Sequence, residues 1–539
     1  MSSFRFLSPG LFAVLAGSVV LASCVGDDPV TTTPAPDGVD GGSNVPDGAV
    51  PADANGGGDA ATNGPVFTAA PARPRVARGA SVDVEITIDR KGLAGDVTIA
   101  ITGLPTGVTA SAASIPAAGT KTQVKLTAAA SAPMGAAPIA ITALGVADLK
   151  TAVVVAGAPG EIDESFDGDG FVLDTAIAAG SFQAVLAQPD GKIVVAGTAN
   201  TAGGAWVVKR LLPDGSPDTA FNTATAAAMP ATGSARALAL DGATGKIVVV
   251  GGSAATEQLT IVRLNPGGGA DQGFASAGVM VADTVSHGQG SRGNAVVVLA
   301  DSSVLVAGRN GTLGLVEAYS AKGLPHPTFL RYQTAVGAEL FGLAALAGGS
   351  YLATGTDLDA SPDAQLAVRL LTNGTPDAAF GGAAGRTYAS GCRGYGLTVA
   401  ANGDAVIVGD DQTAPSLCAT RIAASGNGNF AWTMKTSAGS NGQFLAAATA
   451  SVGDATYSAG HAGGSQDRYA IIERRLLDGG LDPAFGTAGE VRFEDVAGVP
   501  DTYRYVIRAA RSAPDGRILV AGTRTGTVSP GAFVARLWE

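Results

Sequence analysis

Short apolar runs separated by turn residues recur from residue 166 to the end of the chain. In one unit, an apolar run at 184–187 leads through the Pro-Asp-Gly turn at 189–191 into a second run at 192–197. Two apolar runs joined by such a turn are typical of a β-hairpin. A third run, at 205–212, carries basic residues, and a fourth follows a phenylalanine. Each unit is therefore predicted to form four short antiparallel strands.

Three sequence features repeat in a constant order: a phenylalanine, a glycine that closes the second run, and an apolar–basic run such as 262–264. The basic residue of the third feature is missing at 315–318. The phenylalanines stand 50 to 55 residues apart, at Phe166, Phe221, Phe274, Phe329, Phe380, Phe430 and Phe485. Four strands recurring at about fifty residues are the signature of a propeller blade, whereas leucine-rich repeats run to about 20–29 residues. The pattern predicts an all-β fold with a seven-bladed β-propeller.

An aspartate precedes most of these phenylalanines by three residues, but His326 and Asn427 replace it in two units. A short polar side chain at this place can bond nearby backbone N–H groups and fix the turn. We expect the phenylalanines to fill the wedge between neighbouring blades. The first run of each unit is rich in alanine, which suits a strand beside a crowded axis.

The units resemble the delta-60 repeat family. The stretch Leu-Asp-Pro-Ala-Phe-Gly-Thr-Ala-Gly at 481–489 and the stretch Asp-Gly-Arg-Ile-Leu-Val-Ala-Gly at 515–522 carry the resemblance most closely. It covers roughly residues 160–539 and implies a β-propeller. It implies little about activity.

The count of strands predicts how the ring closes. The last unit has three strands and then the chain ends, while one strand, 171–175, stands unpaired before the first unit. An open sheet edge invites aggregation. We therefore expect 171–175 to pair with the last strand, near 532–538. The alternative is that 171–175 lies beside 184–187, as the innermost strand of the first blade.

Residues 65–157 have a different pattern. Strict alternation of apolar and polar residues at 81–89 predicts a half-buried strand, and five more short runs follow between Gly/Pro turns. We predict a small immunoglobulin-like β-sandwich here, without the antibody-type cysteine pair, followed by the propeller at 158–539. The stretch 103–108 resembles bacterial immunoglobulin-like surface modules. A spacer or stalk is the expected role, and a ligand-binding sandwich is the alternative.

The N-terminal residues predict where in the cell the protein is located. Residues 1–23 combine Arg5 with an apolar core at 11–22, too short to cross a bilayer comfortably, as in a signal peptide. The stretch 21–24 resembles a bacterial lipobox, which implies that Cys24 becomes the lipidated N-terminus, with acyl chains such as palmitate. An ordinary secretory signal with an incidental cysteine is the alternative. Residues 24–64 hold seven Asp and no Lys or Arg, and we expect a disordered acidic tether.

These features predict a cell-envelope protein, held on the membrane by its lipid. Val25 after Cys24 points to the outer membrane of a Gram-negative bacterium under the enterobacterial sorting rule. Because the tether carries most of the net charge of −12, the folded part is only mildly acidic, and we expect no nucleic-acid partner. We expect a monomer with an unknown protein or glycan partner.

The remaining cysteines are Cys392 and Cys418. An exported protein meets an oxidising compartment, so we predict a disulfide between them. Cys392 precedes the first strand of blade five and Cys418 opens its third, so the loops must lean together for the bridge to form. Two buried free thiols are the alternative.

No catalytic, cofactor or metal site is predicted. Histidines 287, 326 and 461 have no His or Cys at ligand spacing and are interpreted as surface loop residues. The stretches 167–170 and 214–218 look like calcium loops but lack the full ligand set, so we interpret them as turns. Trp206 and Trp538 favour packing between blades over a glycan platform.

The sequence therefore favours a non-enzymatic binding or scaffolding propeller. The alternative is a lactonase-like or lyase-like enzyme with its site at the mouth of the central channel. Polar residues converging at that mouth would favour the enzyme, and an Ala/Val-lined channel would favour the binding module.

Overall fold

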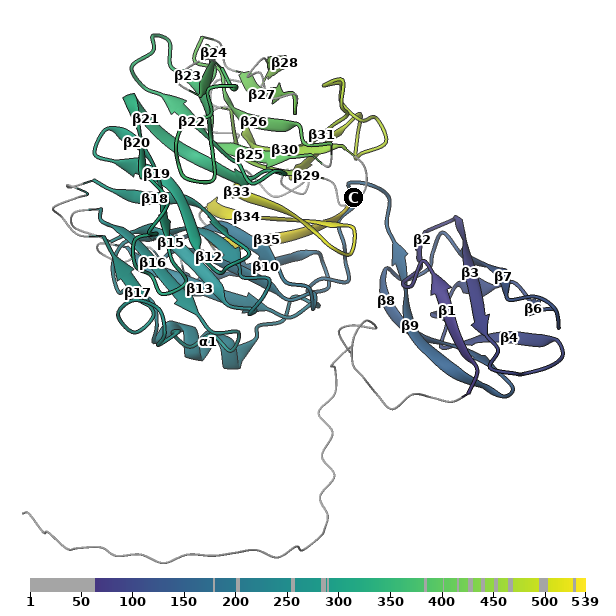
Figure 1. Cartoon of the computed structure of the whole chain (residues 1–539). Helices are drawn as coiled ribbons and strands as arrows, with labels where there is room; N and C mark the ends of the chain where they lie inside the picture. Colours follow the sequence, from purple (N-terminus) through teal and green to yellow (C-terminus); the bar gives the residue numbers. More distant parts are fainter. Residues whose placement is uncertain are drawn as a thin grey trace, which may run out of the picture. The chain divides into compact units, whose positions relative to one another are not determined.

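The computed structural model describes residues 64–177, 180–199, 204–253, 257–282, 287, 290–381, 385–400, 402–413, 416–424, 430–437, 442–449, 454–463, 469–493, 503–526 and 530–539. The fold is almost entirely β-structure (Figure 1). Cys24 and the predicted tether lie outside the described residues. Among the residues in these ranges, no helix is long and apolar enough to span a bilayer.

The first nine strands enclose a core of their own. They are β1 (Val66–Ala70), β2 (Arg75–Ala77), β3 (Ser81–Asp89), β4 (Val97–Thr102), β5 (Val108–Ala110), β6 (Ala113–Ile115), β7 (Lys121–Ala128), β8 (Gly135–Ala143) and β9 (Val146–Ala156). The runs β5-β7-β3-β1 and β9-β8-β4-β6 are joined by one parallel pair, Val66 with Ala147. The alternation in β3 buries Val84, Ile86 and Ile88 between the two runs.

Seven blades follow, which confirms the predicted propeller. Blade one has β11 (Ser181–Ala187), β12 (Ile193–Ala199) and β13 (Ala205–Leu211); blade two has β14 (Ser234–Leu240), β15 (Ile247–Gly252), β16 (Leu259–Leu264) and β17 (Val279–Val281). Blade three has β18 (Arg292–Val298), β19 (Val304–Asn310), β20 (Leu313–Tyr319) and the start of β21 (Tyr332–Ala345). Blade four has the rest of β21, β22 (Tyr351–Asp357), β23 (Ala364–Leu370) and β24 (Arg386–Ser390).

The last three blades complete the ring. Blade five has β25 (Gly396–Val399), β26 (Ala405–Asp410), β27 (Ser416–Ile422) and β28 (Phe430–Ser437). Blade six has β29 (Gln443–Thr449), β30 (Thr456–Ala462), β31 (Tyr469–Arg475) and β32 (Glu490–Phe493). Blade seven has β33 (Tyr503–Ala513), β34 (Arg517–Gly526), β35 (Gly531–Trp538) and β10 (Phe171–Asp174). The innermost strands contact one another in order, and β33 contacts β11.

The ring closes as the strand count predicts. The four residues of β10 pair antiparallel with β35, from Phe171 with Ala535 to Asp174 with Ala532 (Figure 1). An isolated bridge between Ile162 and Leu537 extends the pairing. A strand from the start of the propeller therefore forms the outer edge of its last blade.

The predicted fourth strand of blade one is wrong. The residues after Asp218 form helix α1 (Thr219–Ala226), and the Asp218 side chain accepts a hydrogen bond from the backbone N–H of Phe221. An aspartate N-cap followed by an alanine-rich stretch favours a helix over a strand.

One strand is shared by two blades. β21 pairs with β20 through Tyr332 and Gln333, and with β22 from Ala338 to Ala345, so blades three and four form one seven-stranded sheet. By contrast, helix α1 stands between blades one and two, and residues 391–395 form a loop between blades four and five.

Cys392 and Cys418 are joined by a disulfide, with Cα atoms 6.3 Å apart. Cys392 lies just before β25 and forms a bridge with Asp411, directly after β26. The first strand begins only at Gly396, so Cys392 is free to lean across the end of β26 towards β27. Both cysteines are buried.

Candidate functional site

A unit of three side chains recurs at one face of the propeller, where the third strand of a blade ends. The aspartate of the repeat pairs with an arginine of that strand, and the guanidinium group lies over the ring of the repeat phenylalanine. In blade two, Arg263 Nε lies 2.7 Å from Asp271 Oδ2, and its guanidinium carbon lies 4.5 Å from the centre of the Phe274 ring. Burial, the ion pair and the cation–π contact are thus combined in one place.

Four blades carry the whole unit. The ion pairs are Arg210–Asp218, Arg263–Asp271, Arg369–Asp377 and Arg536–Asp163, and the matching ring contacts are to Phe221, Phe274, Phe380 and Phe166, at 4.0 to 4.9 Å. These phenylalanines are buried between neighbouring blades, as predicted from the sequence. In blade six, Arg474 pairs with Asp482 but lies over Tyr457.

Blade three departs from this arrangement. Ala318 stands where the arginine would be, because it pairs with Leu305 as Arg263 pairs with Val248. His326 stands where the aspartate would be. Its backbone N–H still donates to the Ala318 carbonyl over 2.9 Å, as that of Asp271 does to Arg263. The backbone frame is therefore kept, while both charged partners are replaced.

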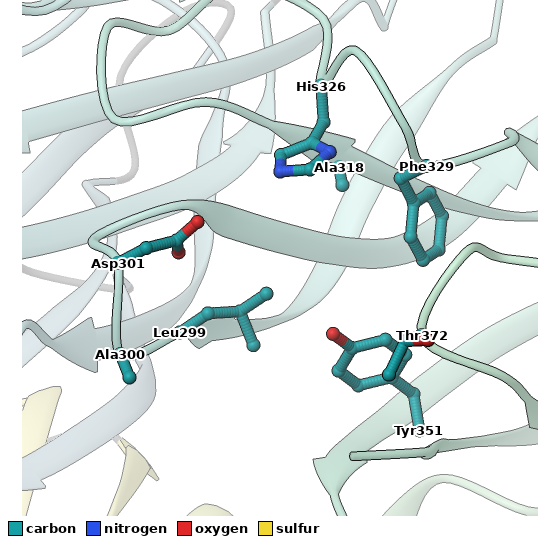
Figure 2. Close-up of a pocket in the computed structure, with 8 residues that line it drawn as sticks. All are labelled: Leu299, Ala300, Asp301, Ala318, His326, Phe329, Tyr351 and Thr372. Atoms are coloured by element: carbon teal, nitrogen blue, oxygen red, sulfur yellow. The ribbon is translucent and has the colours of Figure 1, made fainter.

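A pocket of about 290 Å³ occupies this place (Figure 2). It is lined by Leu299, Ala300, Asp301, Ala318, His326, Phe329, Tyr351 and Thr372. Figure 2 shows Asp301, His326, Phe329 and Tyr351 around one common space. The Phe329 ring is only half-buried, unlike the phenylalanines of the complete units, and it meets Tyr351 edge-on with ring centres 6.0 Å apart.

The surroundings of Asp301 and Tyr351 determine the protonation states of these two polar groups in the pocket. Hydrogen bonds from the backbone and hydroxyl of Ser303, together with the nearby His326, lower the pKa of Asp301 despite its partial burial. Burial and the charge of Asp301 raise the pKa of Tyr351. At neutral pH the pocket therefore presents one carboxylate and one neutral phenol.

Exposed leucines are close in sequence to residues that line the pocket. Leu324 and Leu330 are each 60% exposed and flank the segment that carries His326 and Phe329, and Leu371, at 41%, precedes Thr372. Apolar side chains gathered beside a pocket are typical of interaction sites.

A second polar group lies at the opposite end of the innermost strands. Arg292, the first residue of β18, bonds Glu339 over 2.8 Å and Glu257 over 2.8 Å, and Arg309 bonds Glu257 over 2.7 Å. Burial and the charge of Arg292 lower the pKa of Arg236, which lies in the bulge of β14. Polar residues do converge here, and the carboxylates of this group are engaged in ion pairs.

The interpretation of the histidines as surface residues is wrong for two of them. His287 is 3% exposed and its Nε2 lies 2.7 Å from Glu317 Oε2, while His461 is buried in β30. The Glu317 partner lies in β20, 30 residues further along the chain, which explains why sequence spacing did not reveal it. His326 is half-buried and lies at the pocket.

The tryptophans differ from each other. Trp206 is buried and donates from Nε1 to the Gly252 carbonyl of the next blade, which confirms packing between blades. Trp538 also stands in the third strand of its blade but at the other end of that strand, under Arg517 at 4.2 Å and against Met134 and Val154, which differs from the predicted packing between blades.

The aspartate-rich stretches serve turns. The Asp169 carboxylate accepts from the N–H of Phe171, and that of Asp214 accepts from the N–H and hydroxyl of Ser216. Within the described ranges, no group of three or more His, Cys, Asp or Glu side chains could hold a metal ion.

The pocket had a signal in the sequence: the basic residue at 318 and the acidic residue at 326 are both missing in the same unit. Sequence reasoning recorded both departures but did not connect them, because the ion pair between these two positions was not foreseen.

Comparisons with known proteins bear on the fold. The family described as a domain of unknown function (DUF5122), a beta-propeller, matches residues 188–221 and 242–274, and each stretch ends at a repeat phenylalanine. No curated protein matches the chain.

Three solved structures are similar at low identity. A provisionally assigned 6-phosphogluconolactonase from Bacteroides uniformis is 13% identical, with 63% of this chain and 94% of that chain covered and a TM-score of 0.35. A quinoprotein alcohol dehydrogenase-like protein from Bacteroides thetaiotaomicron is 9% identical, with 68% and 94% covered and a TM-score of 0.29. A eukaryotic initiation factor is 12% identical, with 66% and 87% covered and a TM-score of 0.27. The blades described above and the family match together support a β-propeller family, of which delta-60 repeats are a type, for the repeated part of this chain.

Proposed function

We propose that this chain is a lipid-anchored protein of the bacterial cell envelope whose propeller is a binding module, and that its binding site is the pocket between blades three and four. The lipobox-like stretch ending at Cys24 supports the anchor. An immunoglobulin-like module at 65–157 and an outer-membrane location complete the proposal.

The observation that carries the binding site is the open place in blade three. Four other blades fill the same place with their own arginine, and here Ala318 leaves a pocket with a carboxylate, a phenol and an aromatic ring at its walls. Leucines exposed beside it extend the apolar contact area. A small apolar pocket with a few convergent polar groups is the usual form of a ligand site.

The test is capture of partners from envelope extracts by the full chain in detergent. A partner that binds through the pocket is retained by the natural protein and lost with Ala318→Arg, which fills the pocket from within. Ala484→Arg is the matched control, because Ala484 is an exposed residue of the corresponding segment in blade six. A partner set unchanged by Ala318→Arg would refute the proposed site.

A second candidate function is an enzyme with its site at the channel mouth. The cluster of Arg292, Arg309, Glu257 and Glu339 favours it, since a polar mouth is where converging groups could act on a substrate. Turnover of lactones or of uronic-acid polymers that is abolished by Glu339→Gln and unaffected by Ala318→Arg would identify this function.

A further inference from the structure

We propose that the pocket between blades three and four binds the guanidinium group of an arginine side chain presented by a partner polypeptide. The bound side chain would lie where the arginine of the repeat lies in other blades. This inference rests on the proposed binding function and names the chemistry of its ligand.

The first argument is that the site around the missing side chain is intact. In two complete units, the N–H of the residue after the phenylalanine donates to the turn of the next blade, as Asp167 does to Asp214 and Ala275 does to Lys322. The same bond joins Leu330 to Asn373 over 2.7 Å in blade three. With the bond from His326 to Ala318, it holds Phe329 and the neighbouring turn in the arrangement of a complete unit.

The second argument concerns a carbonyl acceptor. In two of the four complete units the guanidinium also donates to the backbone carbonyl of the residue that precedes that turn position: Arg536 Nη1 donates to Pro213 over 2.5 Å, and Arg210 Nη1 to Pro266 over 2.7 Å. Pro213 precedes Asp214 as Thr372 precedes Asn373. The Thr372 carbonyl is therefore the corresponding acceptor, and Thr372 lines the pocket.

The third argument concerns the counter-charge. His326 removes the carboxylate of the repeat, but Asp301 supplies another from the hairpin turn. Its counterpart in blade seven, Asp515, pairs with Arg517, and its charge raises the pKa of Arg536. A carboxylate at this turn position therefore acts electrostatically on the arginine of the unit. In blade three, Ser303 lies beside the Asp301 carboxylate, at the position that Arg517 occupies in blade seven.

These groups select a planar cation. The half-buried face of Phe329 suits a guanidinium, which stacks on aromatic rings better than a strongly hydrated ammonium does. The Thr372 carbonyl and the Asp301 carboxylate replace the missing aspartate of the unit and offer the guanidinium directed hydrogen-bond acceptors. A pocket of about 290 Å³ is at the lower limit for small-molecule ligands, so it suits one side chain better than a cofactor.

The exposed leucines indicate that the guanidinium belongs to a polypeptide. Leu324 and Leu330 are 60% exposed, Leu371 is 41% exposed, and each is within two residues of a residue that lines the pocket. A free small cation would leave these side chains in water. An arginine with apolar neighbours would cover them, so we expect apolar residues on both sides of the arginine.

The test is calorimetric titration of the full chain in detergent with the acetylated, amidated tripeptide Leu-Arg-Leu. The comparison peptides carry citrulline, which keeps the shape and lacks the charge, or lysine in place of arginine. We expect binding of the arginine peptide, with the citrulline peptide at least about tenfold weaker and the lysine peptide intermediate. Equal affinity for the arginine and citrulline peptides would overturn the proposal.

Two variants locate the binding. Ala318→Arg should abolish it without lowering thermal stability, because the new side chain takes the place of the ligand. Asp301→Asn should weaken it about tenfold, whereas Asp190→Asn, at the corresponding turn of blade one, should leave it unchanged. Binding that survives Ala318→Arg, or that weakens equally in both Asn variants, would overturn the proposal.

The proposal and the function beneath it can fail separately. If an envelope partner is captured and is lost with Ala318→Arg, while no arginine peptide binds, the pocket is the binding site but the guanidinium ligand is wrong. If L-arginine alone binds as tightly as the tripeptide, the site takes a free cation and the polypeptide partner is wrong.

Discussion

Asp163 holds the two ends of the propeller together. Its Oδ2 lies 2.6 Å from Arg517 Nε and 2.8 Å from Arg536 Nε, and its Oδ1 accepts from the hydroxyl of Ser165. The carboxylate belongs to the segment before β10, while both arginines belong to the last blade. We predict that Asp163→Asn strongly destabilises the protein.

The magnitude follows from burial. The side chain of Asp163 is 0% exposed, and those of Arg517 and Arg536 are 4% and 6% exposed, so the substitution removes the ion-pair partner of buried Arg536 and leaves Arg517 with Asp515 alone. Removing one partner of a buried ion pair costs about 3–5 kcal/mol. The matched change, Asp482→Asn in blade six, affects a single pair at 3.3 Å whose side chains are 14% and 18% exposed, and should cost about 1 kcal/mol.

The assay is urea unfolding of both variants and the natural protein, followed by circular dichroism at several pH values. Burial raises the pKa of Asp163, but the charges of Arg536 and Arg517 and hydrogen bonds from Ser165 and Arg517 lower it overall. Its contribution is therefore present above the unfolded-state pKa of about 3.9 and is lost as the pH falls through the lower folded-state value. The deficit of Asp163→Asn should be full at pH 7 and should shrink below about pH 4.

Equal losses of stability in Asp163→Asn and Asp482→Asn at pH 7 would refute this reasoning. It would mean that ring closure depends on the β10–β35 strand pairing and gains nothing particular from the buried carboxylate. A deficit that stays constant down to pH 2 would refute the electrostatic part of the explanation.

Three further predictions follow from the chain. Cys24→Ala should abolish lipidation and release the protein from membranes, which fractionation and mass spectrometry of the mature N-terminus would show; continued membrane association would contradict it. Cys392→Ser with Cys418→Ser should lower the free energy of unfolding by roughly 3 kcal/mol, because the bridge closes a loop of about 25 residues; an unchanged unfolding curve would contradict it. Ala318→Arg with His326→Asp should raise the unfolding free energy by roughly 1 kcal/mol in the same urea assay, since it rebuilds the complete unit; a loss of stability would show that the blade-three frame differs from the others.

Much of the fold could be predicted from the sequence because it depends on local patterns. Hairpin turns, apolar runs and the repeated phenylalanine determine the blades, and the unpaired strand before the first unit determines the closure. The helix after Asp218 was missed because alanine-rich residues suit either the axis of a propeller or a helix, and the cap decides between them. The ion pair of Arg263 with Asp271 was missed because it depends on how a loop folds back over its own strand.

Less of the candidate site could be predicted from the sequence. Ala318 and His326 become meaningful only when their counterparts in the other blades are seen to touch. Thr372 and Asp301 come from two different blades, and the sequence alone does not show that the turn of one blade supplies an acceptor to the arginine of the preceding blade.

The strand shared by blades three and four has a consequence for binding strength. β21 runs from Tyr332 to Ala345 without an intervening loop, so these two blades cannot slide or separate as neighbours joined only by side chains can. The pocket takes Phe329 from just before this strand and Tyr351 from just after it. Its two aromatic walls are thus spaced before any ligand arrives, and little ordering entropy is lost on binding. A short linear segment of a partner makes few contacts. Because the pocket is preorganised, it can still bind such a segment with appreciable affinity.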